Sequence, residues 1–228
     1  MMLRTLLIAS IAATGATAAQ AGERSFSVPA FDRVIVSGSS DVVVATGKAI
    51  SVRASGDDAA LDRLEIKVEK GELQIRNKSK GWNWTSNGKT RVVVTVPMLR
   101  GVDVAGSGNV VVDRIDVPEF SASVAGSGEL KLPSLTTSKA RFSVAGSGSV
   151  DADGRSSETK ASVSGSGSLD IAGLKTGVLS ASVSGSGEVD AFATTSASVS
   201  VAGSGDVRVR GGARCAVSKA GSGSVDCG

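Results

Sequence analysis

The amino-acid sequence predicts an all-β protein, a right-handed parallel β-helix whose coils stack into a rod. Three observations lead to this fold class. Gly-Ser-Gly occurs seven times at steps of 18 to 20 residues, and apolar and polar residues alternate around each copy. Aromatic residues make up only 3% of a chain with 29 glycines. A fixed period near twenty with two-residue alternation is typical of stacked strands around a narrow aliphatic interior.

Aligning the repeats on their first glycine shows which side chains face inward. The aligned glycines are Gly106, Gly126, Gly146, Gly165, Gly185, Gly203 and Gly221. Four residues later come Val110, Leu130, Val150, Leu169, Val189, Val207 and Val225. Two residues before the glycine, six copies have valine and the last has Lys219. We expect these columns to stack between coils, together with a weaker third column of Ile115, Leu135 and Leu174. A β-sandwich would lack the fixed period, and a calcium-binding roll would repeat about every nine residues.

The region 22–100 is less regular and is predicted to start and cap the solenoid, whereas 101–228 holds the seven coils. Residues 31–44 resemble a degenerate first copy, with Gly38 in the position of the first glycine. Lys70-Gly71 predicts a tight hairpin, and residues 78–89 predict a longer one. A cap is expected because open solenoid ends expose unpaired strand edges.

Residues 1–21 have the pattern of a cleaved signal peptide. Arg4 precedes an apolar run from Leu6 to Ala13, and Ala19-Gln20-Ala21 supplies a small-residue cleavage site, with Ala16-Thr17-Ala18 as an alternative site. An N-terminal membrane anchor is the other interpretation, but the apolar run is too short to span a bilayer. No later stretch is apolar enough for a membrane helix. We therefore expect an exported protein, located in the periplasm or at the cell surface.

Composition excludes several chemistries. The chain has no histidine, which rules out Ser-His-Asp and Cys-His catalysis and histidine-bound metals, and its two cysteines are too few for a cysteine-only zinc site. No cofactor is expected, and a net charge of +3 gives no indication of a nucleic-acid partner. Cys215 and Cys227 lie six residues before and after Gly221, both in inward columns. They predict a disulfide across the final coil, as an oxidising compartment permits.

A polar segment between two predicted strands contains the only tryptophans of the chain, and it is the candidate ligand-binding site. Its residues are Lys80, Trp82, Asn83, Trp84 and Lys89. Two indoles at i and i+2 on a strand share one face, where they could stack on sugar rings or lie at a membrane interface. The alternative is a hairpin whose indoles pack on the flank of the solenoid.

A column of carboxylates forms a second candidate. Asp151, Asp170, Asp190 and Asp226 share one outward position, with Glu129, Glu188 and Asp206 two residues earlier. Carboxylates stacked on neighbouring coils could bind calcium, or could serve a polysaccharide lyase or hydrolase. Lys131 and Arg208 interrupt the column, however, and a solvated face of mixed charge needs no ligand. No catalytic residue and no metal site are therefore assigned.

An ordered series of motifs covers nearly the whole chain after residue 21. These are Val34-Ile35-Val36-Ser37-Gly38, Asp41-Val42-Val43-Val44, Leu64-Glu65-Ile66, Gly71-Glu72-Leu73-Gln74-Ile75, Val92-Val93-Val94-Thr95-Val96-Pro97 and Gly106-Ser107-Gly108. In these motifs the chain resembles the head GIN domain family, the auto-transporter adhesins of bacterial envelopes. The resemblance implies a right-handed parallel β-helix and a surface or periplasmic setting. It brings no catalytic residues with it.

The sequence thus favours a non-enzymatic envelope protein, an adhesin or a binding scaffold, with a glycan or another envelope component as its partner. The alternative is a structural protein of envelope assembly, with a bare surface of mixed charge. A carbohydrate-active enzyme on a β-helix is the third hypothesis, and it predicts clustered acids and bases on one flank.

Overall fold

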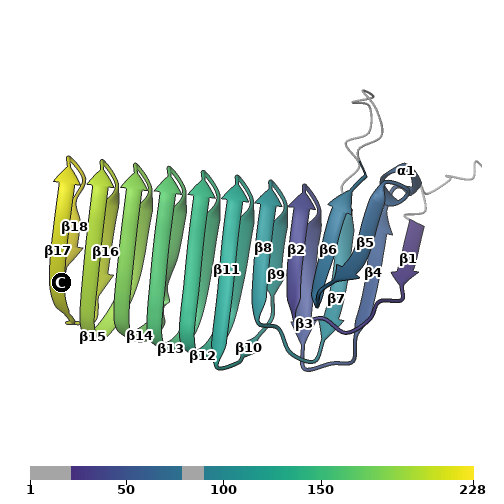
Figure 1. The fold of residues 1–228 in the computed structure, drawn as a ribbon, viewed down its shortest axis with the longest axis horizontal. Coiled ribbons are helices and arrows are strands. Elements are labelled where there is room, and N and C mark those ends of the chain that lie inside the picture. Colours follow the sequence, from purple (N-terminus) through teal and green to yellow (C-terminus); the bar gives the residue numbers. More distant parts are fainter. Residues whose placement is uncertain (1–21, 79–89) are drawn as a thin grey trace, which may run out of the picture.

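The computed structural model describes residues 22–78 and 90–228, and it confirms the predicted fold class. The protein is a β-solenoid of about 6 turns with 74% of its residues in strands and 2% in helix. Figure 1 shows the strands side by side along one long axis, with β17 and β18 at one end and β1, β4 and β5 at the other.

The first nine strands and the helix α1 build the N-terminal part of the rod. They are β1 (Gly22–Phe26), β2 (Arg33–Gly38), β3 (Asp41–Thr46), β4 (Ser51–Gly56), α1 (Asp58–Leu61), β5 (Leu64–Glu69), β6 (Glu72–Asn77), β7 (Arg91–Val96), β8 (Gly101–Gly106) and β9 (Asn109–Val112). The later strands include the longest ones. They are β10 (Ile115–Asp116), β11 (Glu119–Gly126), β12 (Glu129–Gly146), β13 (Ser149–Gly165), β14 (Ser168–Gly185), β15 (Glu188–Gly203), β16 (Asp206–Arg210), β17 (Arg214–Gly221) and β18 (Val225–Cys227).

Each coil has three parts, and we name them here. The entry sheet contains the segments that lead into a Gly-Ser-Gly turn, such as β8 and β11. The exit sheet contains the segments that leave the turn, such as β9 and β16. The corner is the stretch that joins an exit segment to the next entry segment, for example residues 133–138. The strands β12 to β15 run through all three parts without a break.

The coils stack in parallel and in register. The first glycines of all seven repeats pair directly with one another from Gly106 to Gly221. In the column four residues later, Val150 pairs with Leu169 and Leu169 with Val189, and each is at most 1% exposed. The predicted inward columns are therefore confirmed, and they fill one continuous core.

The turn needs glycine for two separate reasons. Gly146 has a φ of +113°, a conformation that side-chain-bearing residues rarely adopt. A Cβ built on Gly146 would also lie 2.6 Å from the carbonyl oxygen of Gly126 in the preceding coil. That oxygen accepts a hydrogen bond from the backbone N–H of Ser147 at 2.8 Å. The turns can therefore stack at strand spacing only because no side chain stands between them.

The predicted degenerate first copy is confirmed. Strand β2 pairs with β8 in parallel, and Gly38 lies opposite Gly106. Strand β3 pairs with β9 in the same way, so residues 33–46 form the turn of a regular coil. One more layer lies beyond it, because β6 pairs in parallel with β2 and β7 in parallel with β3.

Antiparallel strands close the N-terminal end. Strand β4 pairs with β7 and β1 with β4, both antiparallel, while β5 and β6 form the predicted hairpin at Lys70-Gly71. Lys70 has a φ of +53°, as expected in a tight turn. The buried side chain of Leu61 on α1 belongs to the core, and Arg24 of β1 bonds Asp62 at 2.6 Å. Leu61 thus packs onto the core at this end.

The C-terminal coil is held by a covalent bond. Cys215 on β17 and Cys227 on β18 form the predicted disulfide, which joins the entry sheet to the exit sheet. Beside it Lys219 replaces the valine of the earlier coils, and its Nζ donates a hydrogen bond to the carbonyl of Gly223 at 3.0 Å. Val217 in the same coil is 50% exposed, whereas its counterparts in the preceding coils are buried.

Removing the disulfide should destabilise this coil. We expect Cys215→Ser to lower the free energy of unfolding by about 2 to 3 kcal/mol, since the bond closes a short loop in the unfolded chain. The cysteines are 12 residues apart in the sequence. Denaturant unfolding with and without reductant measures the change, and the reduced wild type should match the variant. Equal stability of the oxidised wild type and the variant would contradict the prediction.

Candidate functional site

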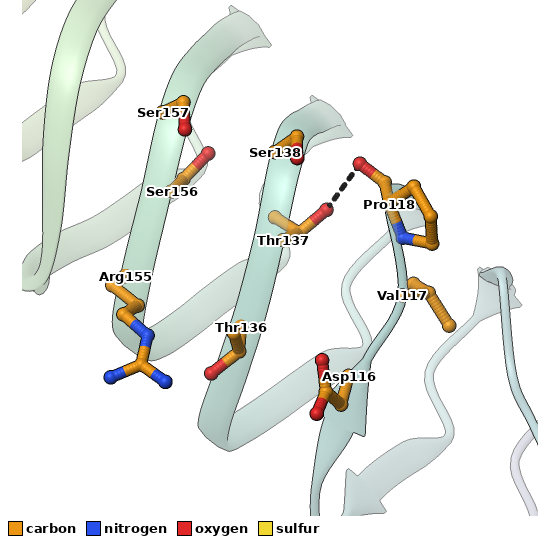
Figure 2. Close-up of a pocket in the computed structure, with 9 residues that line it drawn as sticks. All are labelled: Asp116, Val117, Pro118, Thr136, Thr137, Ser138, Arg155, Ser156 and Ser157. Carbon is orange, nitrogen blue, oxygen red and sulfur yellow. Dashed lines mark hydrogen bonds between the residues drawn. The ribbon is translucent and has the colours of Figure 1, made fainter.

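A polar depression lies at the corner, where three successive coils meet. This corner hollow has a volume of about 440 Å³. It is lined by Asp116, Val117, Pro118, Thr136, Thr137, Ser138, Arg155, Ser156 and Ser157 (Figure 2). The residues come from β10 and the segment after it, from β12 and from β13, so the site exists only in the stacked protein.

Pro118 explains why the surface is recessed here. Proline has no backbone N–H to donate to a neighbouring strand, and strand pairing stops between Asp116 and Glu119. The carbonyl of Pro118 instead accepts bonds from the backbone N–H groups of Ser138 and Lys139, each at 3.0 Å. It also accepts the hydroxyl of Thr137 at 3.0 Å (Figure 2). The backbone thus bends without leaving this carbonyl unpaired.

The hydroxyls of the hollow fall into two groups. Thr137 and Ser156 are buried, and both donate to backbone carbonyls, Ser156 to that of Glu158 at 2.8 Å. These two hold the corner in shape. Thr136, Ser138 and Ser157 are partly or fully exposed, and their hydroxyls form no hydrogen bond within the described residues. Those three remain available to a ligand.

A row of different charges crosses the hollow. Asp116 pairs in register with Thr136, and Thr136 with Arg155, so the three side chains occupy one column on successive coils (Figure 2). Neither Asp116 nor Arg155 forms an ion pair with a residue in the ranges 22–78 and 90–228. The row offers an acceptor, a hydroxyl and a five-donor guanidinium within a few strand spacings. This combination suits a ligand rich in hydroxyl groups.

A second hollow of about 440 Å³ adjoins the first and shares Asp116 and Val117 with it. Its wall includes Thr46, whose hydroxyl donates to the carbonyl of Arg114 at 2.6 Å. Asp116 thus lies between two depressions. Together their linings extend from Thr46 of the first regular coil to Ser157, which lies in the third step between Gly-Ser-Gly segments.

The tryptophan segment predicted as the ligand site lies outside the described residues. Its two flanking strands are described, however. Asn77 of β6 lies beside Gly38, and Thr90 bonds the buried hydroxyl of Ser40 at 2.8 Å. The described residues on either side of it, Asn77 and Thr90, therefore lie beside the turn of residues 38–40, which corresponds to the Gly-Ser-Gly turns of the later coils.

The predicted acidic column is present on the exit sheet. Asp151 pairs in register with Asp170, and Asp170 with Asp190. The interrupting cations are also engaged, since Arg208 bonds Asp190 at 3.2 Å and Glu188 at 2.8 Å. Among the residues that the structure describes, no group of three acidic, cysteine or histidine side chains is arranged to hold a metal ion.

The acidic column should reduce stability at neutral pH. Partial burial and the carboxylates of Asp153 and Asp170 raise the pKa of Asp151 above its ordinary value of 3.8. The folded protein therefore binds this proton more tightly than the unfolded chain, and stability falls as the pH rises from about 3.8. We expect Asp151→Asn to raise the melting temperature at pH 7, with a gain that shrinks at pH 3. Asp190→Asn is the control, because it removes a partner of Arg208 and should bring no gain. An unchanged melting temperature for Asp151→Asn at pH 7 would refute the explanation.

Sequence reasoning did not find the corner hollow. The available signal was the variation in step length between repeats, since residues are gained or lost at the corner while the turns stay aligned. The register shifts between Leu132 and Leu135 and again between Asp151 and Gly154. Irregularity of this kind often accompanies functional positions in β structures.

These features define a class of protein, a closed β-solenoid whose polar hollows lie on the outside of the rod. The sequence matches the family model "Putative auto-transporter adhesin, head GIN domain" over residues 30–213. The chain belongs to this family, as its motifs predicted. Among curated proteins, no significant match was found.

Solved structures of several bacterial proteins share the fold. A "putative adhesin" from Bacteroides fragilis is 22% identical with a TM-score of 0.84, over 92% of this chain and 98% of that one. A "putative lipid binding protein" from Parabacteroides distasonis is 20% identical with a TM-score of 0.73, over 92% and 97%. A "putative adhesin" from Parabacteroides merdae is 16% identical with a TM-score of 0.74, over 92% and 97%. At these identities the likeness shows the fold alone.

Proposed function

We propose that this protein is a non-enzymatic binding protein of the bacterial envelope, of the adhesin type, which binds a glycan in the corner hollow. The observation that carries the proposal is the row of Asp116, Thr136 and Arg155, whose two charged groups have no partner among the described residues. The family and the solved adhesin-like structures support the same type of protein.

The chemistry of the hollow supports binding rather than catalysis. Glycoside hydrolysis ordinarily needs two carboxyl groups on either side of the scissile bond. Asp116 is the single acidic residue among those that line the hollow. The Arg155 guanidinium carries hydrogen-bond donors and no acceptor, which suits the binding of a ligand.

An envelope location agrees with this function. Residues 1–21 have the pattern of a signal peptide, and the disulfide fits an oxidising compartment. Within residues 22–78 and 90–228, no helix has the length and apolar character to cross a membrane. Export to the periplasm or the cell surface is part of the proposal.

A screen of neutral glycans and peptidoglycan fragments by isothermal titration calorimetry tests the function. We expect Arg155→Ala to weaken the affinity for the bound glycan by about tenfold, the effect of one lost charge-assisted hydrogen bond. Arg214→Ala, which removes an exposed arginine at the far end of the rod, is the matched control. Trp82→Ala/Trp84→Ala tests the tryptophan segment in parallel.

The outcomes separate the alternatives. Cleavage of a polymer by the wild type would replace the proposal with a carbohydrate-active enzyme. Absence of binding across the screen would favour a structural role in envelope assembly. Binding that is lost only in the double tryptophan variant would place the ligand at the segment 80–89 instead of the corner.

A further inference from the structure

A second hollow lies on the outer face of the entry sheet, away from the corner. This sheet hollow has a volume of about 470 Å³, and its lining residues come from β2, β8 and β11 to β14. Serine side chains from four coils line it, namely Ser121, Ser123, Ser143, Ser162, Ser180 and Ser182. Arg141 and Lys160 line it as well. The floor is therefore made of small hydroxyl groups, and long cationic side chains stand beside it.

The cations are arranged differently from the other charges on this sheet. In the column nearest the corner, Glu119 pairs in register with Lys139 and Lys139 with Glu158, so the signs alternate. In the next column Arg141 pairs directly with Lys160. Like charges directly opposite each other on neighbouring strands are unfavourable. The entry sheet thus places two cations side by side in this column, whereas acidic and basic residues alternate in the adjoining column.

Arg141 and Lys160 each have a carboxylate within ion-pair distance, but neither forms a hydrogen bond to it among the described residues. The Nη1 of Arg141 lies 3.7 Å from Glu119, and the Nζ of Lys160 lies 3.8 Å from Glu158. Glu119 also pairs with Lys139 at 3.4 Å. Arg33 at the N-terminal side of the hollow is different, because it bonds Asp103 at 2.8 Å. Arg141 and Lys160 therefore keep their donors for an anion.

Several of the serine hydroxyls have no hydrogen-bond partner among the described residues. Ser121 accepts a bond from Arg33 at 3.0 Å, but the hydroxyls of Ser143, Ser162 and Ser182 have no partner among the described residues. Ser143 pairs in register with Ser162 and Ser162 with Ser182, so one hydroxyl occurs per coil at a spacing of about 4.8 Å. A row of this kind can bind a polymer that lies along the rod and repeats its hydroxyl groups.

We propose that the sheet hollow binds an acidic polysaccharide, with Arg141 and Lys160 on its carboxylates and the serine row on its hydroxyl groups. This proposal rests on the proposed function as a binding protein of the envelope, but the residues that carry it differ from those of the corner hollow. A polysaccharide fits better than a membrane surface, because the strands β11 to β14 expose one large apolar side chain, that of Val178. Insertion into a membrane interface needs a larger apolar area.

Titration with polygalacturonate, and with the same polymer after methyl esterification, tests the proposal. We expect the purified protein to bind the free acid and not the ester. The double variant Arg141→Ser/Lys160→Ser should lose affinity by about tenfold or more, since two charge-assisted contacts are removed. Thermal unfolding of the variant shows whether it keeps its fold, and the removal of two adjacent like charges should not lower its melting temperature.

The matched control is Lys131→Ser/Arg208→Ser, which removes the same charge from the exit sheet. An equal loss of affinity in this control would show that net charge alone causes the effect. It would overturn the proposal that the polymer binds in the sheet hollow. Equal binding of acid and ester would overturn the requirement for carboxylates. Binding to phosphatidylglycerol vesicles without binding to polygalacturonate would overturn the polysaccharide proposal and would indicate a membrane surface as the partner. Arg155→Ala should keep its affinity for polygalacturonate, so the two proposals fail separately.

Discussion

The variant Gly146→Ala is expected to lose about 3 kcal/mol or more of unfolding free energy, with a fall in melting temperature on the order of 10 °C. The new Cβ would meet the carbonyl oxygen of Gly126 at 2.6 Å, in a backbone conformation with a φ of +113°. Neither problem can be relieved by a side-chain rotation. Relief would require the turns to separate, which would break the hydrogen bond from Ser147 to Gly126.

Ser147→Ala is the matched control, because it lies in the same turn and adds no atom. The side chain of Ser147 is exposed, and its backbone N–H still donates after the substitution. Its melting temperature should stay within about 2 °C of the wild type, as is usual for surface substitutions. Circular dichroism melting measures both variants. Similar melting temperatures for Gly146→Ala and Ser147→Ala would show that the turn does not depend on close stacking.

Leu169→Ala is expected to lower the free energy of unfolding by about 3 kcal/mol, because apolar burial is lost and a cavity is left behind. Leu169 is 1% exposed and lies between Val150 and Val189 of the adjacent coils. Both neighbours are fixed by their own strand pairing, so the core cannot close over the space. Denaturant unfolding with a shared m-value gives the change directly.

Two valines of the same column show how the cost of one substitution depends on the position of its coil in the stack. Val189 is buried between two coils, whereas Val225 in the last coil is partly exposed and pairs only with Val207. In a protein whose coils contact only their neighbours, Val189→Ala should destabilise more than Val225→Ala. Equal losses would indicate that the terminal coil is as tightly packed as the centre.

Much of the rod could be predicted because its pattern is local and repeated. The two-residue alternation around each Gly-Ser-Gly determines which side chains face inward, so it predicts the burial of Val150, Leu169 and Val189. The same alignment placed Gly38 in an extra coil and Cys215 within reach of Cys227. Each of these features follows from one residue's position within its own repeat.

Only the tertiary structure decided what happens at the corner. There the repeats differ in length. Gly154, with a φ of +132°, lies between Leu135 and Leu174 in the weaker third column. Thr159 and Thr176 are buried and bond each other at 2.9 Å across two coils, although each reads as an ordinary polar residue. The corner hollow depends on such contacts between coils, because the shape of an irregular segment is set by the neighbour that it packs against. A repeating sequence determines its own register, but it does not specify how unequal loops fit together.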